Sequence, residues 1–292
     1  MSGERSATVA RDVWRRLEPI HSVVYFAPEA AGAFTDAGYR GFWMGYFAGR
    51  AAPLGPVGPE VVEALFYNFA GERVRRALPD AWSIAGPGAA LAARRAGAGA
   101  ALRRVLAPFL DGPELADAAD LAAAAARSAS RLGRALFAAN AALDWPDDPL
   151  DVLWHAATLL REHRGDGHVA LLLANGLSGR ESNVVQSAAG NVPRAMIVRA
   201  RDYDDGEWDD VVAALAARGL MTDDGALTED GRQLRETLER RTDEAALGAY
   251  DVLDDDALDR LLTVLTPLTK AVVAGGDLPA VTPMGPTFAS DV

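Results

Sequence analysis

Apolar residues recur along most of the chain at the spacing of one helical face. Between Asp148 and His163 they return every three or four positions, and Asp148 can cap the helix that this spacing predicts. Gly165 predicts the end of that helix, and a second helix is expected over residues 167–175. The sequence S-G-R-E at residues 178–181 is a capping-box pattern that opens a third helix. Three short helices joined by glycine-containing turns form the frame of a helix-turn-helix.

The same period predicts helices through the rest of the chain, with one short exception. The helical segments are expected at residues 9–24 with a kink at Pro19, and at residues 60–77, 88–110, 113–143, 207–218, 228–250 and 255–273. The exception follows the segment 207–218. Two short apolar pieces flank the sequence D-D-G at residues 223–225, and this arrangement predicts a small β-hairpin.

Composition narrows the classes of protein that this chain can belong to. It has 292 residues, half of them hydrophobic, and no run of about 18 apolar residues, so we expect a globular cytoplasmic protein that does not contact membranes. The absence of cysteine excludes disulfides, thiolate metal sites and cysteine nucleophiles. A net charge of −12 repels polyanions, so binding of nucleic acid would require a segregated basic patch.

The segment at residues 208–243 carries a recognisable pattern, L-x-x-R-G-L, then D-G, then L-T-x-x-G-R. Leu215 anchors a helix, Gly219 ends it, and Thr228 opens the next helix. The segment resembles the recognition helix, wing and following helix of MarR-like winged-helix proteins. With G-Y-F-A-G-R-A-A-P-L-G at residues 45–55, the whole chain resembles a group of actinobacterial, all-helical proteins that contain a winged helix.

The resemblance implies a fold that is mainly α, in two domains. An N-terminal helical domain is expected at residues 1–146, and a C-terminal winged helix-turn-helix-like domain with a small β-hairpin at 147–274. The boundary is placed at the sequence L-D-W-P-D-D-P, and the tail at 275–292 is expected to be irregular. The resemblance also implies a homodimer.

A MarR-like regulator places the helix at 207–218 in the major groove and the wing near the minor groove. Here that helix begins with Glu207, Asp209 and Asp210, and the turn of the wing is also acidic. DNA-binding domains gain affinity by neutralising phosphates, so acidic side chains at this end oppose binding. We therefore expect a structural or partner-binding module that does not bind nucleic acid.

Aromatic residues indicate a small-molecule pocket in the N-terminal half. Residues 25–55 contain eight of the 21 aromatic residues, and buried Tyr and Trp need hydrogen-bond partners. One continuous helix would align several of them with an arginine that can pair with a carboxylate. We expect a cavity between this helix and the helix that carries Trp154, holding a planar or carboxylate-bearing small molecule. The candidate ligand-binding residues are His21, Tyr25, Tyr39, Trp43, Tyr46, Arg50, Tyr67, Asn68, Trp154 and His155.

Gly41, Gly45 and Gly49 lie four residues apart and form a smooth stripe on the same helix. Close packing against another element is the preferred interpretation, and a surface for a flat ligand is the alternative.

Metal and haem are considered as cofactors. Glu162, His163, Asp166 and His168 could approach one another across a turn at Gly165, but the spacings H-x-x-x-H and H-E-x-x-H do not occur. Charge pairs with neighbouring arginines are the preferred interpretation of these residues. Haem is a further alternative, with a histidine as axial ligand and the aromatic residues as walls. No catalytic residue can be assigned.

The preferred hypothesis is a small-molecule-binding protein, either a ligand sensor or an accessory protein, whose winged helix has lost DNA binding. One alternative is an enzyme of unknown reaction, haem- or metal-dependent, built on the same pocket. The other alternative is a MarR-like DNA-binding transcriptional regulator.

Overall fold

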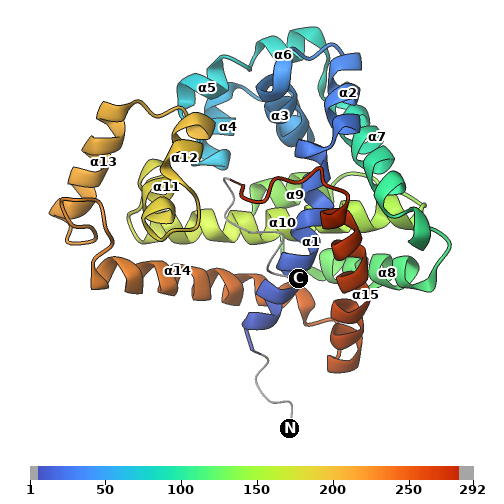
Figure 1. Ribbon diagram of the computed structural model, residues 1–292. Coiled ribbons are helices and arrows are strands. Elements are labelled where there is room, and N and C mark those ends of the chain that lie inside the picture. Colours follow the sequence, from blue (N-terminus) through green and yellow to red (C-terminus); the bar gives the residue numbers. More distant parts are fainter. Residues whose placement is uncertain (1–5, 283–292) are drawn as a thin grey trace.

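The computed structural model describes residues 6–282, and these are mainly helical (Figure 1). They form fifteen α-helices and three short 3-10 helices, and none of these helices is long and apolar enough to cross a membrane. Residues 275–282 contain no helix or strand, and the remainder of the expected tail lies outside the described residues. The α-helices are α1 Thr8–Phe26, α2 Pro28–Asp36, α3 Gly41–Ala51, α4 Pro59–Phe66, α5 Gly71–Arg75, α6 Asp80–Ile84, α7 Pro87–Val105, α8 Pro113–Ser128, α9 Ala135–Ala141, α10 Pro149–Ala174, α11 Gly179–Ala188, α12 Arg194–Arg201, α13 Asp205–Ala217, α14 Glu229–Leu247 and α15 Asp255–Ala274.

The longest helix, α10, runs through the middle of the molecule beside α14 (Figure 1). The Asp148 carboxylate accepts hydrogen bonds from the N–H groups of Leu150 and Asp151, so the helix begins as its sequence predicts. The expected end at Gly165 is wrong, because the helix continues to Ala174. A glycine inside a helix costs about 1 kcal/mol, and burial of α10 against α8, α9 and α14 outweighs that cost.

Gly167 is also helical, and its small size has a different reason. The guanidinium of Arg134 lies against it and donates hydrogen bonds to the carbonyls of His163 and Ala245. A Cβ atom at residue 167 would lie 2.6 Å from Nη1 of Arg134. The glycine therefore permits close approach of an arginine and does not begin a new helix.

Two hydrophobic cores divide the molecule. The larger core is formed by α1 to α9, the first half of α10 and α15, and the smaller core by the end of α10 with α11 to α14. α15 returns to pack on α1 and α8, where Leu261, Leu265 and Leu268 are buried. The expected division between residues 1–146 and 147–274 is therefore not supported, because α10 belongs to both cores and α15 belongs to the first.

α11, α12 and α13 lie in a lobe at the left of Figure 1. α11 opens with the expected capping box, in which Ser178 and Glu181 bond to each other's backbone N–H groups. The expected β-hairpin does not form, because the β-pairing in residues 6–282 is a single antiparallel bridge between Met221 and Leu227. Thr228 already caps α14, so too few residues remain for a strand.

Three other expectations about helix ends change. α1 is continuous through Pro19, since the residues around the proline are buried on both sides. The helix expected at 60–77 ends at Phe66, because Tyr67 has a positive φ of 59° and its hydroxyl donates to the carbonyl of Leu177. The helix expected at 113–143 is divided into α8 and α9 by a turn that contains Gly133.

Candidate functional site

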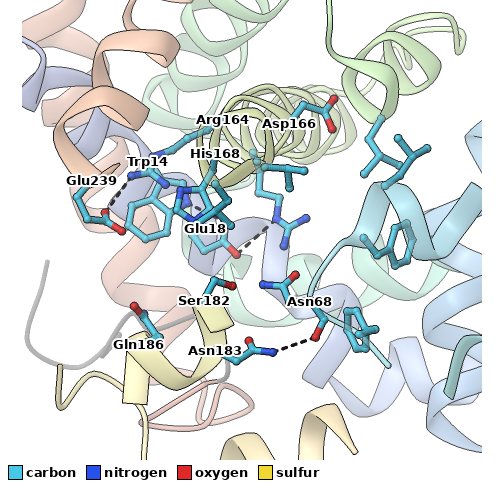
Figure 2. A pocket seen from close by; sticks show the side chains of 18 of the residues that line it. Trp14, Glu18, Asn68, Arg164, Asp166, His168, Ser182, Asn183, Gln186 and Glu239 are labelled. Carbon is cyan, nitrogen blue, oxygen red and sulfur yellow. Dashed lines mark hydrogen bonds and ion pairs between the residues drawn. The ribbon is translucent and has the colours of Figure 1, made fainter. Parts of the chain in front are cut away.

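A cavity of about 470 Å³ lies where the two cores meet. Its walls come from α1, α3, α4, α9, α10, α11, α12 and α14. Figure 2 shows Trp14, Glu18 and His168 on one side and Ser182 and Asn183 on the opposite side. The volume falls within the range of about 300–1,000 Å³ that small-molecule sites occupy.

The cavity is rich in arginine although the chain has a net charge of −12. Seven arginines and three acidic residues line it. The arginines are Arg11, Arg15, Arg50, Arg161, Arg164, Arg201 and Arg235, and the acidic residues are Glu18, Asp166 and Glu239. The residues that line the cavity therefore carry more positive than negative side chains.

Helical spacing places several of these charges on facing surfaces. On α10, Arg161, Arg164 and His168 follow one another at three and four residues, so they share one face. On α1, Arg11 and Arg15 lie four residues apart and face α10, against which α1 packs. The cavity therefore lies between two arginine-bearing helix faces.

Glu162 neutralises two of the arginines. Its Oε1 accepts from Nε of Arg50 at 2.9 Å and from Nη1 of Arg161 at 2.9 Å, and its Oε2 accepts from Nη2 of Arg50 at 3.0 Å. Burial opposes the ionisation of this carboxyl, but the charges of Arg161 and Arg50 outweigh burial and hold its pKa well below its usual value. Arg161 is also 3.8 Å from Glu18.

Carboxylates on α14 neutralise two more arginines of the cavity, Arg11 and Arg164. Asp243 is 2.6 Å from Arg11 and 2.9 Å from Arg164, and Glu239 is 3.6 Å from each of these arginines. The Nδ1 atom of His168 on α10 is 2.9 Å from the hydroxyl of Thr242 on α14. These contacts join α1 and α10 to α14 along one edge of the cavity.

Arg201, the last residue of α12, differs from these four arginines. Its side chain is 92% buried with the guanidinium 4.1 Å from the ring centre of Phe69, and its Nε has no hydrogen-bond partner among the described residues. No carboxylate within residues 6–282 pairs with it. Burial, together with the charges of Arg50 and Arg161, lowers the pKa of Arg201 to about 10.

Asp166 is an acidic residue of the cavity with an altered pKa. Its Oδ2 accepts from the backbone N–H of Phe137 at 2.9 Å. Burial raises the pKa of this carboxyl to about 6, against the opposing effect of that hydrogen bond. Its negative charge is therefore partly lost in mildly acidic solution.

The structure brings together some of the predicted ligand-binding residues. Tyr46, Arg50 and Asn68 line the large cavity, and His21 and Tyr25 join Tyr46 and Arg50 around a small neighbouring cavity of about 20 Å³. The small cavity lies where the ligand site was expected, but its volume suits about one water molecule. The large cavity lies beyond the Arg50–Glu162 pair, toward α11 and α12.

The other predicted residues line neither cavity and have partners of their own. The hydroxyl of Tyr39 donates to the carbonyl of Ala85 at 2.9 Å, and the ring of Trp43 lies under the guanidinium of Arg73. Tyr67 donates to Leu177, Trp154 donates to the carbonyl of His21 at 3.4 Å, and His155 meets the ring of Trp145 edge to face.

The expected stripe of Tyr39, Trp43, Tyr46 and Arg50 on one helix is not continuous, because Tyr39 precedes the first residue of α3. The glycine stripe on that helix faces Phe34 of α2. Cβ atoms at Gly45 and Gly49 would lie 3.1 and 2.5 Å from the Phe34 side chain. Close packing therefore accounts for these two glycines.

Arg161, Arg164 and Arg201 are absent from the predicted site residues. The three-residue spacing of the first two on a helix with a buried face is a signal that could have placed them together. Nothing local singles out Arg201, because its burial depends on Phe69, which is distant in sequence.

The four possible metal ligands have separate partners. Glu162 pairs with arginines, the ring of His163 packs against Phe137, Asp166 accepts from a backbone N–H, and His168 bonds to Thr242. Within residues 6–282, no group of three His, Asp or Glu side chains could hold a metal ion.

Haem ligation finds little support in the histidines. Of the four, His168 alone lines the large cavity, and His21 uses both ring nitrogens in contacts with Thr158 and Tyr25. Burial lowers the pKa of His155 and of His163 to about 4 and that of His21 below its usual value.

The lobe of α11, α12 and α13 presents an acidic surface on α13. Asp205 and Asp209 are strongly exposed there, and Arg194 of α12 lies 3.6 and 3.4 Å from them. At the other end of α13, Arg218 pairs with Glu181 at 2.7 Å. These two arginines next to α13 are thus engaged with carboxylates of the same lobe.

Comparison with known proteins assigns the family. No curated protein and no solved structure is similar enough to count as a match. The model of a helix-turn-helix family matches residues 10–279, which include both cores and the whole cavity. The chain therefore belongs to this helix-turn-helix family.

Proposed function

We propose that this helix-turn-helix protein binds a small molecule that carries a carboxylate, in the cavity between its two cores. The observation that carries the proposal is the excess of arginine in that cavity, in a chain whose net charge is −12. Guanidinium groups form strong, bidentate hydrogen bonds with carboxylates, and Tyr46, Phe66 and Phe69 supply aromatic walls for a planar body. The protein would act as a ligand sensor or an accessory protein.

The proposal is tested by analysis of what the folded protein retains. Protein purified without denaturation is unfolded, and the small molecules released are identified by mass spectrometry. We expect a carboxylic acid, and we expect added carboxylic acids to raise Tm more than their neutral amides do. Release of no small molecule, together with equal Tm values for acids and amides, would contradict the proposal.

Two arginines on α14 provide a matched pair of variants. Arg235 lines the cavity and its Nε is buried without a partner among the described residues, whereas Arg240 is exposed and pairs with Glu244. Arg235→Met should weaken binding of the acid, because it removes a charge from the cavity wall. Arg240→Met should bind as the unchanged protein does, since Arg240 does not line the cavity and its charge is exposed to solvent, which screens it.

For the lobe, we propose a MarR-like winged helix that does not bind DNA through α13. The exposed acidic face of α13 supports this proposal, because Asp205 and Asp209 would approach phosphates. The ion pairs of Arg194 and Arg218 also leave few basic groups for phosphate contacts. The same resemblance suggests a homodimer, which sedimentation velocity would detect.

A DNA-binding regulator is the second candidate, and the helix-turn-helix family match favours it. Binding to duplex DNA from upstream of the coding sequence is measured by fluorescence anisotropy between 50 and 200 mM salt. A protein with several phosphate contacts loses roughly 10³–10⁵ in affinity over this range. We expect no salt-dependent binding, and a steep loss of affinity with salt would establish the second candidate instead.

A further inference from the structure

Arg201 is buried at a cost that the other described residues, 6–282, do not offset with a carboxylate. Burial of a charged group in a protein interior is unfavourable unless a counter-charge or a full set of hydrogen bonds compensates it. Arg201 is 92% buried, and no carboxylate in residues 6–282 pairs with it. The ring of Phe69, 4.1 Å away, provides a cation–π contact that recovers only part of that cost.

The groups around Arg201 increase the need for an anion. Arg50 and Arg161 are close enough to lower its pKa, and the charge of Glu162 is already shared between these two arginines. Asn183, across the cavity wall, donates to the carbonyl of Asn68 and supplies no negative charge. The described residues around Arg201 therefore offer it no carboxylate of its own.

Another part of the cavity wall is apolar. Leu65, Phe66, Val169 and Leu172 are apolar residues that line the same space. A ligand that satisfies both regions has an oxyanion at one end and an apolar or aromatic body at the other. At water's share of about 30 Å³ for each molecule, the cavity has room for roughly 15 non-hydrogen atoms.

We infer that Arg201 is the residue that binds the oxyanion of the ligand, with its guanidinium over the ring of Phe69 and the ligand's apolar body against Phe66 and Leu172. This inference rests on the proposed function and makes it more specific. It replaces Arg50, whose Nε and Nη2 are occupied by Glu162, as the partner of the ligand's acid group. A carboxylate and a phosphate share the required chemistry.

Arg201 also connects the cavity to the lobe of α11, α12 and α13. Its carbonyl accepts from Nη1 of Arg180 at 2.6 Å, and the next residue, Asp202, has a left-handed φ of 60°. The Asp202 carboxylate pairs with Arg73 and Arg76 beside the large core. An oxyanion at Arg201 would therefore stabilise the junction from which α13 begins.

The test compares Arg201→Met with the unchanged protein by thermal unfolding. The probes are inorganic phosphate, 3-phenylpropionate and the neutral 3-phenylpropionamide, each at the same ionic strength set with chloride. We expect at least one of the two anions to raise the Tm of the unchanged protein by about 3 °C. A ligand that binds one site at about ten times its Kd produces a shift of this size. The anion that stabilises identifies the source, and the amide should have no such effect.

In Arg201→Met the same anion should no longer raise Tm. Without either probe anion, this variant should be more stable than the unchanged protein. Removal of an uncompensated charge with retention of the side chain's stem accounts for the second result. Arg50→Met is the contrasting variant and should lower Tm, because it leaves Glu162 with one arginine fewer. Arg201→Lys, which keeps the charge, should retain part of the anion effect if Arg201→Met fails to fold.

The inference is wrong if neither anion raises the Tm of the unchanged protein, or if the shift is the same in Arg201→Met. Its failure is separate from failure of the proposed function. A small molecule that remains bound to purified Arg201→Met would support a ligand-binding protein in which another residue holds the ligand. Loss of the carried molecule in this variant, with the fold retained, supports Arg201.

Discussion

At the scale of single residues, Glu162 decides whether α3 and α10 can lie together. Its carboxylate is the counter-charge for the buried Arg50 and for Arg161, and its exposed fraction is 1%. Loss of one partner from a buried ion pair costs about 3–5 kcal/mol, because the remaining charge has no solvent to stabilise it. The stability of the large core should therefore depend strongly on this one side chain.

We expect Glu162→Gln to lower the free energy of unfolding by about 3–5 kcal/mol at pH 7, measured by urea denaturation. Glu244→Gln, which breaks an exposed pair with Arg240, should change it by less than about 1 kcal/mol. The folded pKa of Glu162 is lowered from 4.5, so its contribution is complete above pH 4.5 and is lost as pH falls below that value. If Glu162→Gln and Glu244→Gln lowered the free energy of unfolding equally, the result would argue against the buried pair.

The stability contributed by Asp166 depends on pH in the opposite direction. Its folded pKa is raised from 3.8 to about 6, so the ionised carboxyl is unfavourable in the folded state and stability decreases as pH rises through that interval. Asp166→Asn should stabilise the protein by roughly 1 kcal/mol at pH 8 and by almost nothing at pH 3.5. Chemical denaturation at both pH values, with Asp120→Asn as an exposed control, measures the difference. A variant that is less stable at pH 8 would mean that the hydrogen bond to Phe137 outweighs the charge.

At the scale of the helix, Gly165 of α10 and Gly179 of α11 differ in whether a side chain would fit, although the sequence alone does not distinguish them. A Cβ at Gly165 would meet only the Glu162 carboxylate at 3.8 Å, so an alanine fits there. A Cβ at Gly179 would lie 1.9 Å from the carbonyl oxygen of Tyr67, in the segment that joins α4 to α5. The first glycine reflects no steric need, whereas the second permits contact between the two cores.

We expect Gly165→Ala to raise the free energy of unfolding by up to about 1 kcal/mol, the helix propensity gained. Gly179→Ala should lower it by about 1–3 kcal/mol, because the Tyr67 backbone must move. Urea denaturation of both variants decides the matter, and two changes of the same sign would show that helix propensity alone governs these positions.

At the scale of the whole molecule, the large core is not complete within one half of the sequence. α15 packs on α1 and α8, and its buried leucines each contribute about 1.5–3 kcal/mol to the large core. α10 supplies Leu153 and Trp154 to the same core and Leu172 to the smaller one. The cavity exists because α10 and α14 connect the cores at a distance that side chains do not fill.

The fragment 1–146 should therefore not fold alone. We expect it to lack a cooperative thermal transition by circular dichroism, whereas the full chain unfolds cooperatively. The reason is that α10 and α15 cover much of its apolar surface in the complete protein. A sharp transition of the fragment would restore the division at residue 146.

Local signals were sufficient for the long helices and for several of their first residues, but not for the short helices α2, α5, α6 and α12. Asp148, Ser178 and Thr228 cap α10, α11 and α14 as their sequences predict, because a cap involves only the next three residues. Gly165 misled for the same reason, since the packing of α10 on other helices, which favours its continuation past this glycine, is not visible in the local sequence. The acidic first turn of α13 is likewise readable from the sequence alone.

The sequence by itself determined a mainly helical protein, its caps and its net charge, because each depends on residue types or on contacts within one turn. Tertiary structure alone decided that α15 returns to the first core, that Glu162 occupies Arg50, and that Arg201 is buried beside Phe69 without a counter-charge. These contacts join residues far apart in the chain, so no spacing or periodicity encodes them. The place of the cavity depends on all of them together, and only the packing of the two cores defines it.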